Sequence, residues 1–317
     1  MRILHISDFH LKAPFGQPVD NIFSRLYSFL AANAEETRFD HIVITGDIRD
    51  SKEGADCESI IRIIREIMVS TKIEQESLVH IIPGNHDLNR NVDDETVIGK
   101  IRDDYDFDRW IFARHTESLP LMLNRFDGFF MQLCDLFYDK SGNPWNKNQN
   151  PHVLYIDNRH AFISLNSCLT CINSKRDGEL LIGIHYLQQL IEAINDAKNI
   201  FILSHHPLQN LSNREETELE RLLLSIKEKN LYWLCGDAHN NRASGREYIK
   251  LLQVGSLTGS SKTIPDFAIY DIDDDNALKR RVFRFLPHLN GASANPGGWK
   301  RVYIDPKSPS IQYMEYE

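Results

Sequence analysis

Cysteine and long apolar runs are both scarce in this chain of 317 residues. An odd number of cysteines cannot all pair in disulfides, no signal-peptide pattern is present, and the chain starts directly in a predicted strand. We therefore expect a reducing, cytoplasmic setting in which the thiols are buried and structural. No apolar run approaches the ~18 residues that a membrane span requires, so no membrane association is expected. The cysteines are Cys57, Cys134, Cys168, Cys171 and Cys235.

A basic excess is also missing. The 36 Lys and Arg residues are outnumbered by 45 Asp and Glu residues, which gives a formal net charge of −9. This balance argues against a protein built to coat nucleic acid, although a local basic groove remains compatible with it. Hydrophobic residues make up 42% and charged residues 26% of the chain, the ordinary range for a globular protein. A length of 317 residues allows one large domain, or one domain with an appendage.

Clusters of carboxylate, amide and imidazole side chains follow several apolar runs that read as buried strands. In an open α/β sheet such strand ends border the crevice where ligands bind. Oxygen and imidazole ligands suit manganese, iron or zinc, and two metals about 3.5–4 Å apart need a bridging carboxylate on a rigid strand end. We expect Asp47 to be that bridge. The clusters are Asp8-Phe9-His10, Asp47 to Asp50, Gly84-Asn85-His86-Asp87, Ser204-His205-His206-Pro207 and Gly236-Asp237-Ala238-His239.

Strand and helix patterns alternate in the first part of the chain, which predicts parallel strands joined by right-handed crossovers. The expected strands there are 1–7, 41–45 and 78–82, and the helices are 22–33 and 59–69. The second half is richer in strands. Its expected elements are a hairpin at 152–156 and 161–165, strands at 200–203, 231–235, 249–254, 267–272, 281–286 and 300–304, and helices at 180–195 and 215–229. Periodicity alone therefore predicts a mostly parallel α/β core with a β-rich second half.

Residues 89–150 form a connection too long to be a simple loop. Its first part is acidic, and an apolar helical pattern follows over 119–138. We expect a mainly helical insertion that caps the crevice, and this insertion is a candidate surface for a protein partner.

The ordered set Asp8-x-His10, Gly46-Asp47-x-x-Asp50, Gly84-Asn85-His86-Asp87, His205-x-Pro207 and Gly236-x-x-His239 resembles the calcineurin-like metallophosphoesterase superfamily, in its cyclic-nucleotide phosphodiesterase-like or repair-exonuclease-like branch. The resemblance implies a four-layer α/β/β/α sandwich. It places the metallophosphoesterase domain at 1–275, with the cap at about 89–150. Residues 276–317 are then a β-rich C-terminal extension packed on the same domain.

Ligand roles follow from the same resemblance. It implies that one metal is held by Asp8, His10, Asp47 and His239, and a second metal by Asp47, Asn85, His205 and Asp237. It also implies that His86 stabilises the phosphate or protonates the leaving oxygen, and that Asp50 orients His86. The family pattern usually has a histidine where this chain has Asp237. Two readings stay open: an active site with a more anionic second metal position, or a degraded site.

The resulting function is a dinuclear metal-dependent phosphoesterase, with a phosphodiesterase favoured, that hydrolyses a phosphate ester by attack of a metal-bridging hydroxide. The expected cofactors are two divalent metal ions, with manganese favoured and iron, zinc or magnesium also compatible. A nucleotide is one candidate substrate. The alternatives are a metal-dependent nuclease acting on DNA or RNA, and a catalytically silent metal-binding scaffold or sensor subunit. His5, His41 and His80 are expected to pack within strands, while His206 either lines the pocket or is structural.

Overall fold

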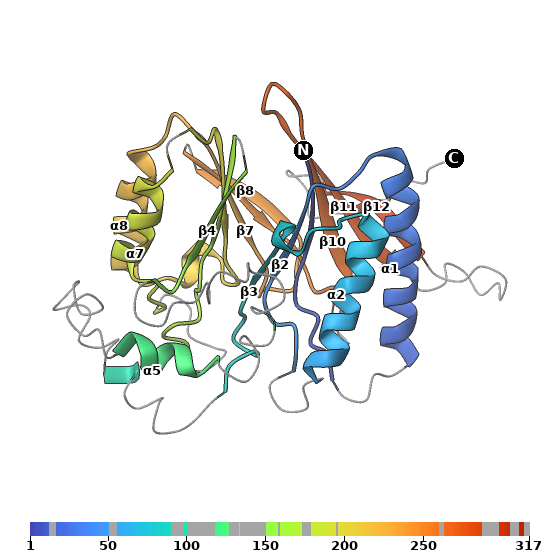
Figure 1. Cartoon of the computed structure of the whole chain (residues 1–317), viewed down its shortest axis with the longest axis horizontal. Helices are drawn as coiled ribbons and strands as arrows, with labels where there is room; N and C mark the ends of the chain where they lie inside the picture. Colours follow the sequence, from blue (N-terminus) through green and yellow to red (C-terminus); the bar gives the residue numbers. More distant parts are fainter. Residues whose placement is uncertain are drawn as a thin grey trace.

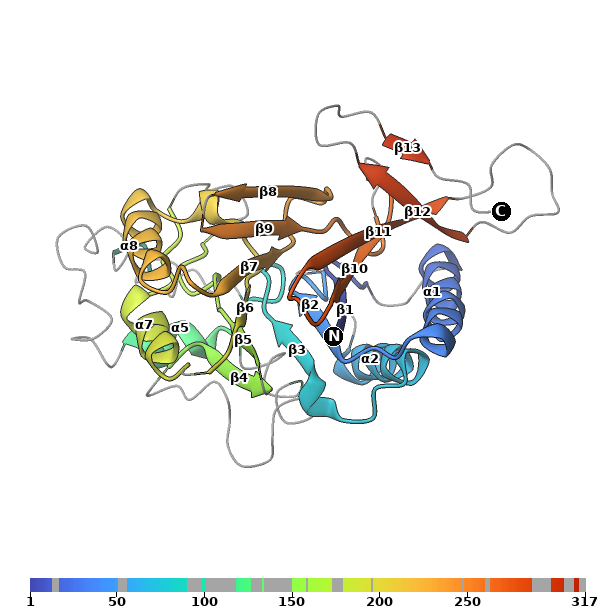
Figure 2. The same cartoon turned by 90° about the horizontal axis from the view of Figure 1, so that it is seen from above.

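Two β-sheets face one another in the middle of the molecule, and helices cover the outer face of each (Figure 1 and Figure 2). From one outer side to the other, the layers are α7 and α8, the second sheet, the first sheet, and α1 with α2. This is the four-layer α/β/β/α sandwich that the sequence motifs predicted. The computed structural model describes residues 1–12, 17–50, 56–89, 98–100, 118–126, 133, 150–157, 159–172, 179–194, 196–246, 248–259, 263–286, 298–304 and 311–313.

The first sheet combines the N-terminal strands with strands from the end of the chain. Within the described residues its order is β13-β12-β11-β10-β1-β2-β3. The neighbours β1, β2 and β3 are parallel, with Ile3 opposite His41, whereas β10 pairs antiparallel with β1. The strands are β1 (Arg2–Ile6), β2 (His41–Thr45), β3 (Val79–Ile82), β10 (Asp266–Ile272), β11 (Leu278–Leu286), β12 (Gly298–Ile304) and β13 (Ile311–Tyr313).

The second sheet has the order β4-β5-β6-β7-β9-β8 in the described part of the chain. Its central strands β5, β6, β7 and β9 are parallel, and antiparallel strands close both edges. The strands are β4 (Val153–Asp157), β5 (His160–Ser164), β6 (Asn199–Leu203), β7 (Asn230–Cys235), β8 (Arg242–Arg246) and β9 (Ile249–Gln253). The carboxyl ends of β6 and β7 therefore point the same way as each other, as do those of β1 to β3.

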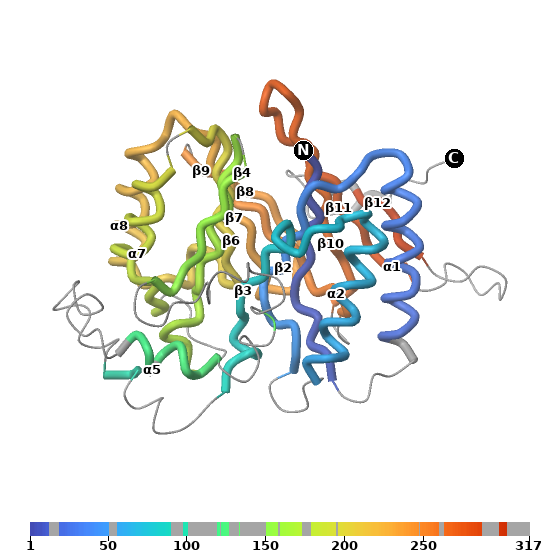
Figure 3. The backbone as a smooth tube through the Cα atoms, in the orientation of Figure 1, coloured from blue at the N-terminus to red at the C-terminus, as the bar shows by residue number. Residues whose placement is uncertain are grey.

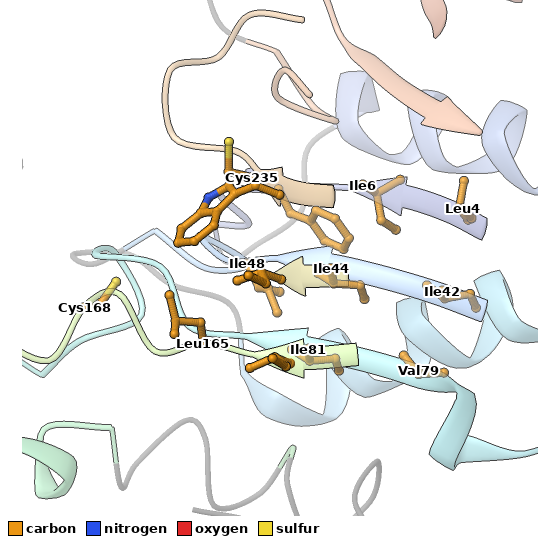
Figure 4. Close-up of a cluster of buried hydrophobic side chains, with 14 of the residues drawn as sticks. Leu4, Ile6, Ile42, Ile44, Ile48, Val79, Ile81, Leu165, Cys168 and Cys235 are labelled. Carbon is orange, nitrogen blue, oxygen red and sulfur yellow. The ribbon is translucent and has the colours of Figure 1, made fainter. Parts of the chain in front are cut away.

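Helices α1 (Gln17–Glu36) and α2 (Cys57–Thr71) cover the first sheet. Helix α2 begins where the Asp56 carboxylate accepts a hydrogen bond from Ser59 N at 2.8 Å, and it ends at Lys72, whose φ of 60° is left-handed. Its isoleucines at helical spacing pack on the apolar face of the sheet. Figure 4 shows that face, with side chains of β1, β2 and β3 in one buried cluster.

Helices α7 (Ile184–Glu192) and α8 (Asn213–Leu224) cover the second sheet. The two helices are linked by Glu215, a buried residue of α8 whose carboxylate accepts hydrogen bonds from Ile182 N at 3.0 Å and Gly183 N at 3.2 Å. These contacts lie at the start of α7, where free backbone N–H groups need acceptors.

Aromatic and aliphatic side chains fill the space between the sheets. Phe162 of β5 stacks on His80 of β3 with ring centroids 4.3 Å apart, and it also contacts His41 of β2 at 4.4 Å. Both histidines are buried, His41 with 0% and His80 with 2% of the residue exposed, so they pack within strands as predicted. The inter-sheet cluster is formed by Ile3, Val43, Ile82, Phe162, Phe201, Leu203, Tyr232, Leu234, Leu252, Val254, Ala268, Tyr270 and Ile272.

Several elements differ from the predicted ones. Periodicity indicated a mostly parallel α/β core with a β-rich second half, and it left open that the strands divide between two sheets, as the tube in Figure 3 traces. The helix expected over 180–195 spans only 184–192, because Leu180 pairs with Leu211 and Gly183 has a left-handed φ of 73°. The helix expected over 215–229 spans 213–224, and strands β8 and β13 were not predicted.

Most of the expected insertion at 89–150 lies outside the described residues. Within it, α5 (Ser118–Asn124) is a helix, as the pattern over 119–138 predicted for its first part. The proposed boundary near residue 275 falls between β10 and β11, two neighbouring strands of the first sheet. None of the described helices is long and apolar enough to cross a membrane.

Candidate metal centre

The predicted ligand clusters converge where the carboxyl ends of β1, β2 and β3 meet those of β6 and β7. Several of these ligands have a left-handed backbone, which costs about 1–3 kcal/mol for a residue other than glycine. Seven described non-glycine residues have positive φ, and five of them are predicted ligands. Such concentrated strain is typical of a functional site rather than of ordinary turns. The five are Asp8 (φ 54°), His10 (45°), Asp47 (50°), Asp237 (66°) and His239 (50°).

Two glycines allow these loops to approach each other closely. A Cβ atom at Gly84 would collide with the carboxylate and backbone nitrogen of Asp47, and one at Gly236 would collide with Ser7 and Asp8. Glycine at each position therefore permits a carboxylate to contact the backbone of the neighbouring loop. Asp237 N, next to Gly236, donates a hydrogen bond to Asp8 Oδ2 at 3.1 Å.

One group of donor atoms consists of Asp8, His10 and His239. The Asp8 Oδ1 atom lies 3.7 Å from His10 Nε2 and 3.2 Å from His239 Nε2, and the two imidazole nitrogens are 3.0 Å apart. Asp8 is fully buried, yet its Oδ1 has no hydrogen-bond partner within the described residues. A buried carboxylate oxygen facing two imidazole nitrogens fits a divalent cation.

A second group contains Asn85, His205 and Asp237. His205 Nε2 lies 3.1 Å from Asn85 Oδ1 and 3.7 Å from Asp237 Oδ1. The other ring nitrogen, Nδ1, is 2.7 Å from the carbonyl oxygen of Thr45 and donates to it. In the neutral ring this bond leaves the lone pair on Nε2, which is the usual arrangement of a metal-binding histidine.

Asp47 lies between the two groups. Its Oδ2 is 3.7 Å from His10 Nε2 and 3.4 Å from His205 Nε2, so one carboxylate oxygen faces a histidine of each group. The other oxygen, Oδ1, accepts a hydrogen bond from His86 N at 2.8 Å. The structure therefore brings together the seven predicted ligands.

The charges of the site favour a bound cation. Burial alone would raise the pKa of Asp8, but the neighbouring imidazoles of His10 and His239 outweigh it and lower that pKa. Burial would also lower the pKa values of His10 and His205, yet the carboxylates Asp8 and Asp47 raise both. Without a metal, these rings therefore attract protons, which divalent ions must displace on binding.

His86 and Asp50 lie at the edge of the same region. The His86 side chain is partly exposed, and its Nε2 is 4.0 Å from Asp47 Oδ2. The Asp50 carboxylate forms an ion pair with Lys12, whose Nζ lies 3.6 Å from Oδ2. The orienting role of Asp50 toward His86 stays a prediction.

Asp87 was not among the predicted site residues. It is fully buried, and its carboxylate accepts hydrogen bonds from Gly84 N at 2.9 Å, Ile48 N at 3.1 Å and Arg49 N at 3.1 Å. Burial and the neighbouring charge of Asp47 raise the pKa of Asp87 to about 7, against the backbone donors, which favour the carboxylate. Asp87 thus ties the loop after β2 to the loop after β3. Its place three residues after Gly84 in a turn was the signal available in the sequence.

The chain is similar to known proteins over the residues that supply these donor atoms. A family model described as calcineurin-like phosphoesterase matches residues 1–241. An uncharacterized metallophosphoesterase-like protein of Bacillus subtilis (strain 168), YydB, is 23% identical over 290 residues. That alignment covers 87% of this chain and 57% of the relative, so the chain spans less than two thirds of the relative's length.

A solved structure shares the fold at low identity. A dimetal phosphatase from Danio rerio matches with a TM-score of 0.50 and 13% identity, over 90% of this chain and 95% of that chain. A 5'-nucleotidase from Candida albicans matches with a TM-score of 0.47 and 14% identity, over 89% of this chain and 51% of that chain. The family match spans the whole stretch from Asp8 to His239 that supplies the donor atoms described above. The chain therefore belongs to the calcineurin-like phosphoesterase family.

Proposed function

We propose that this protein is a dinuclear metal-dependent phosphodiesterase. The observation that carries the proposal is the position of Asp47, whose Oδ2 faces His10 at 3.7 Å and His205 at 3.4 Å. A carboxylate shared between two groups of nitrogen and oxygen donors is what a two-metal hydrolytic centre requires. A single-metal site would leave one of the two groups without a function.

Asp8, His10, Asp47 and His239 would hold one metal, and Asp47, Asn85, His205 and Asp237 the other. When bound, two divalent ions supply Lewis-acid stabilisation of phosphoryl oxygens and lower the pKa of water for attack on phosphorus. The second set contains two carboxylates, one amide oxygen and one imidazole. Such an oxygen-rich set favours manganese or magnesium over zinc, so manganese is the proposed metal.

His86 is proposed as the group that stabilises the phosphate or protonates the leaving oxygen. Its backbone N–H donates to Asp47 Oδ1 at 2.8 Å, while the ring remains partly exposed. A cationic imidazole at this place can donate a proton to an alkoxide leaving group, and a neutral one can donate a hydrogen bond to a phosphoryl oxygen. Asp50 would orient the His86 ring.

The charge of the site supports diesters over monoesters. Asp237 adds a negative charge where the family pattern usually has a neutral histidine. A phosphomonoester carries up to two negative charges near neutral pH, whereas a diester carries one. Repulsion from Asp237 should therefore weaken monoester binding more than diester binding. A nucleotide diester is one member of the proposed substrate class.

The test compares manganese-loaded wild-type protein with Asp47→Asn. Wild type should bind two metal ions and hydrolyse bis(p-nitrophenyl) phosphate faster than p-nitrophenyl phosphate. Asp47→Asn should lose most bound metal and nearly all turnover. Asp56→Asn is the matched control, because it makes the same replacement at an exposed helix cap. Full metal stoichiometry in Asp47→Asn would count decisively against the bridging role.

Experiments on the manganese-loaded wild-type protein also distinguish the two alternative functions, a silent scaffold and a nuclease. A silent scaffold would bind both metals without turning over any diester. A nuclease would bind single-stranded DNA with a steep dependence on salt concentration. The basic side chains of β11 give this alternative little support, because Arg281 pairs with Asp271 at 2.6 Å and Arg284 lies 3.6 Å from Asp266. The cytoplasmic location and a protein partner for the 89–150 insertion stay predictions.

A further inference from the structure

His206 lies beside the second donor group but is not one of the proposed ligands. Its side chain is nearly buried, with 5% of the residue exposed. One of its ring nitrogens lies within 4.8 Å of the donor atoms of His205 and Asp237. The imidazole could therefore serve as an additional ligand through a lone pair, or donate a hydrogen bond through an N–H. The position of the ring proton decides between these roles.

Ser167 determines where that proton is. Its Oγ accepts a hydrogen bond from His206 N at 3.2 Å and lies 3.0 Å from His206 Nδ1. Ser167 is fully buried, and within the described residues its hydroxyl hydrogen has no other acceptor. A buried hydroxyl left without an acceptor is costly, so the hydroxyl donates to Nδ1. The neutral ring must then carry its proton on Nε2.

Cys168 supports the same assignment. Its Sγ lies 3.7 Å from His206 Nδ1 and 3.5 Å from the carbonyl oxygen of Pro83. A thiol is a weak donor, and both neighbours of Sγ can accept from it. Because the thiol donates to Pro83 O, it does not compete with the Ser167 hydroxyl for the single lone pair of Nδ1. Within the described residues, Nε2 has no hydrogen-bond partner of its own.

We infer that His206 binds substrate by donating its Nε2–H to a phosphoryl oxygen held at the second donor group, and that it is not a metal ligand. This inference rests on the proposed phosphodiesterase function for the identity of its acceptor. A fixed N–H donor near developing negative charge stabilises the phosphoryl group without reorganisation. Ser167 is then a positioning residue, because it acts through the tautomer of His206.

The tautomer can be tested without metal or turnover. Long-range ¹⁵N–¹H spectra of the metal-free protein distinguish a protonated Nε2 from a protonated Nδ1. At pH 8, wild type should show the proton of His206 on Nε2, and Ser167→Ala should show a mixture. A wild-type ring protonated on Nδ1 would overturn the inference.

The donor role is tested by calorimetric binding of inorganic phosphate to manganese-loaded protein. His206→Phe removes the donor and fills the space, so phosphate should bind roughly 10- to 100-fold more weakly with metal content unchanged. His206→Gln places an amide N–H near the Nε2 position and should bind phosphate within a few-fold of wild type. Metal loss in His206→Phe would identify a ligand instead, and unchanged phosphate binding would exclude the donor role.

These experiments distinguish a failure of the role inferred for His206 from a failure of the proposed phosphodiesterase function. Wild type that binds phosphate and metals but hydrolyses no diester would refute the enzyme while leaving the phosphate-binding role of His206 intact. With active protein, the loss in His206→Phe should be equal for good and poor leaving groups, because the donor contacts a non-leaving oxygen. A loss that grows with poorer leaving groups would overturn the assigned contact.

If His206→Phe does not fold, Ser167→Ala supplies the measurement. Ser167→Ala should bind inorganic phosphate more weakly than wild type, and unchanged phosphate binding would contradict the inference.

Discussion

Replacing Asp87 by asparagine should loosen the metal centre although Asp87 is not a proposed ligand. The carboxylate accepts hydrogen bonds from Ile48 N and Arg49 N through Oδ1 and from Gly84 N through Oδ2. Asparagine has nearly the same shape, but only one of its two terminal atoms can accept. In either orientation its NH2 group faces at least one backbone N–H.

The size of the effect follows from these contacts. A buried hydrogen bond to a charged group contributes about 1.5–3 kcal/mol, and leaving a buried N–H without an acceptor costs about 1–3 kcal/mol. Relief of repulsion between Asp87 and Asp47 offsets part of the loss. We expect the free energy of unfolding of the metal-free protein to fall by about 2–4 kcal/mol at pH 8. Because Asp87 joins the loops that present Asp47 and Asn85, manganese should bind about 10- to 100-fold more weakly.

Urea unfolding of metal-free protein and manganese calorimetry measure the two effects separately. Asp56→Asn is again the control, since an exposed asparagine caps a helix about as well as aspartate does. Its stability and manganese affinity should match wild type. If Asp87→Asn stays within 0.5 kcal/mol of wild type, roughly the spread of surface substitutions, and binds manganese equally well, the inferred tie between the loops is wrong.

Three further predictions concern other groups. His86→Ala should keep its metal content and lower turnover by roughly two to four orders of magnitude, less for nitrophenyl leaving groups; loss of metal would instead identify a ligand. Asp237→His should move metal preference from manganese toward zinc and raise the ratio of monoester to diester hydrolysis; unchanged preference would mean that residue 237 does not reach the metal. Burial lowers the pKa of His41 to about 4 and the pKa of His80 well below its usual value. Unfolding restores a pKa of about 6.5 to each ring, so below that pH the unfolded state binds more protons than the folded state. The free energy of unfolding should therefore be highest above about pH 6.5 and fall as the pH drops toward about 4. In His80→Phe, about one proton fewer should be taken up on unfolding, so this fall should be less steep in a series of unfolding curves at different pH.

The sequence was most informative where a strand end and a chemical motif coincide. The strand expected at 41–45 is β2, and Asp47 follows it at the centre of the donor groups. Assignment of strands to sheets could not be predicted, because a buried apolar run looks the same in either sheet. Strand β10 lies beside β1 across more than 260 residues, a pairing that no local pattern encodes.

Strand β8 and the role of Asp87 were not predicted because both depend on tertiary contacts. Strand β8 consists of exposed residues without alternating polarity, and it exists because it pairs antiparallel with β9, where Arg246 lies opposite Ile249. Asp87 was missed because its role is to accept backbone hydrogen bonds from another loop. Such a role depends on tertiary contacts and leaves no signature beyond an aspartate in a turn.

The strained backbone at the ligands implies that the fold, rather than the metals, builds the site. Left-handed residues at Asp8, His10 and Asp47 persist only because surrounding contacts outweigh their cost. Those contacts run between the two loops: Asp8 N donates to Gly46 O at 3.0 Å, and His10 N donates to Asp47 O at 2.9 Å. Each bond fixes one ligand by the backbone of the next loop, and none of them requires a metal. The donor atoms therefore lie in place before binding, so metal affinity should depend on residues such as Asp87 that hold the loops together.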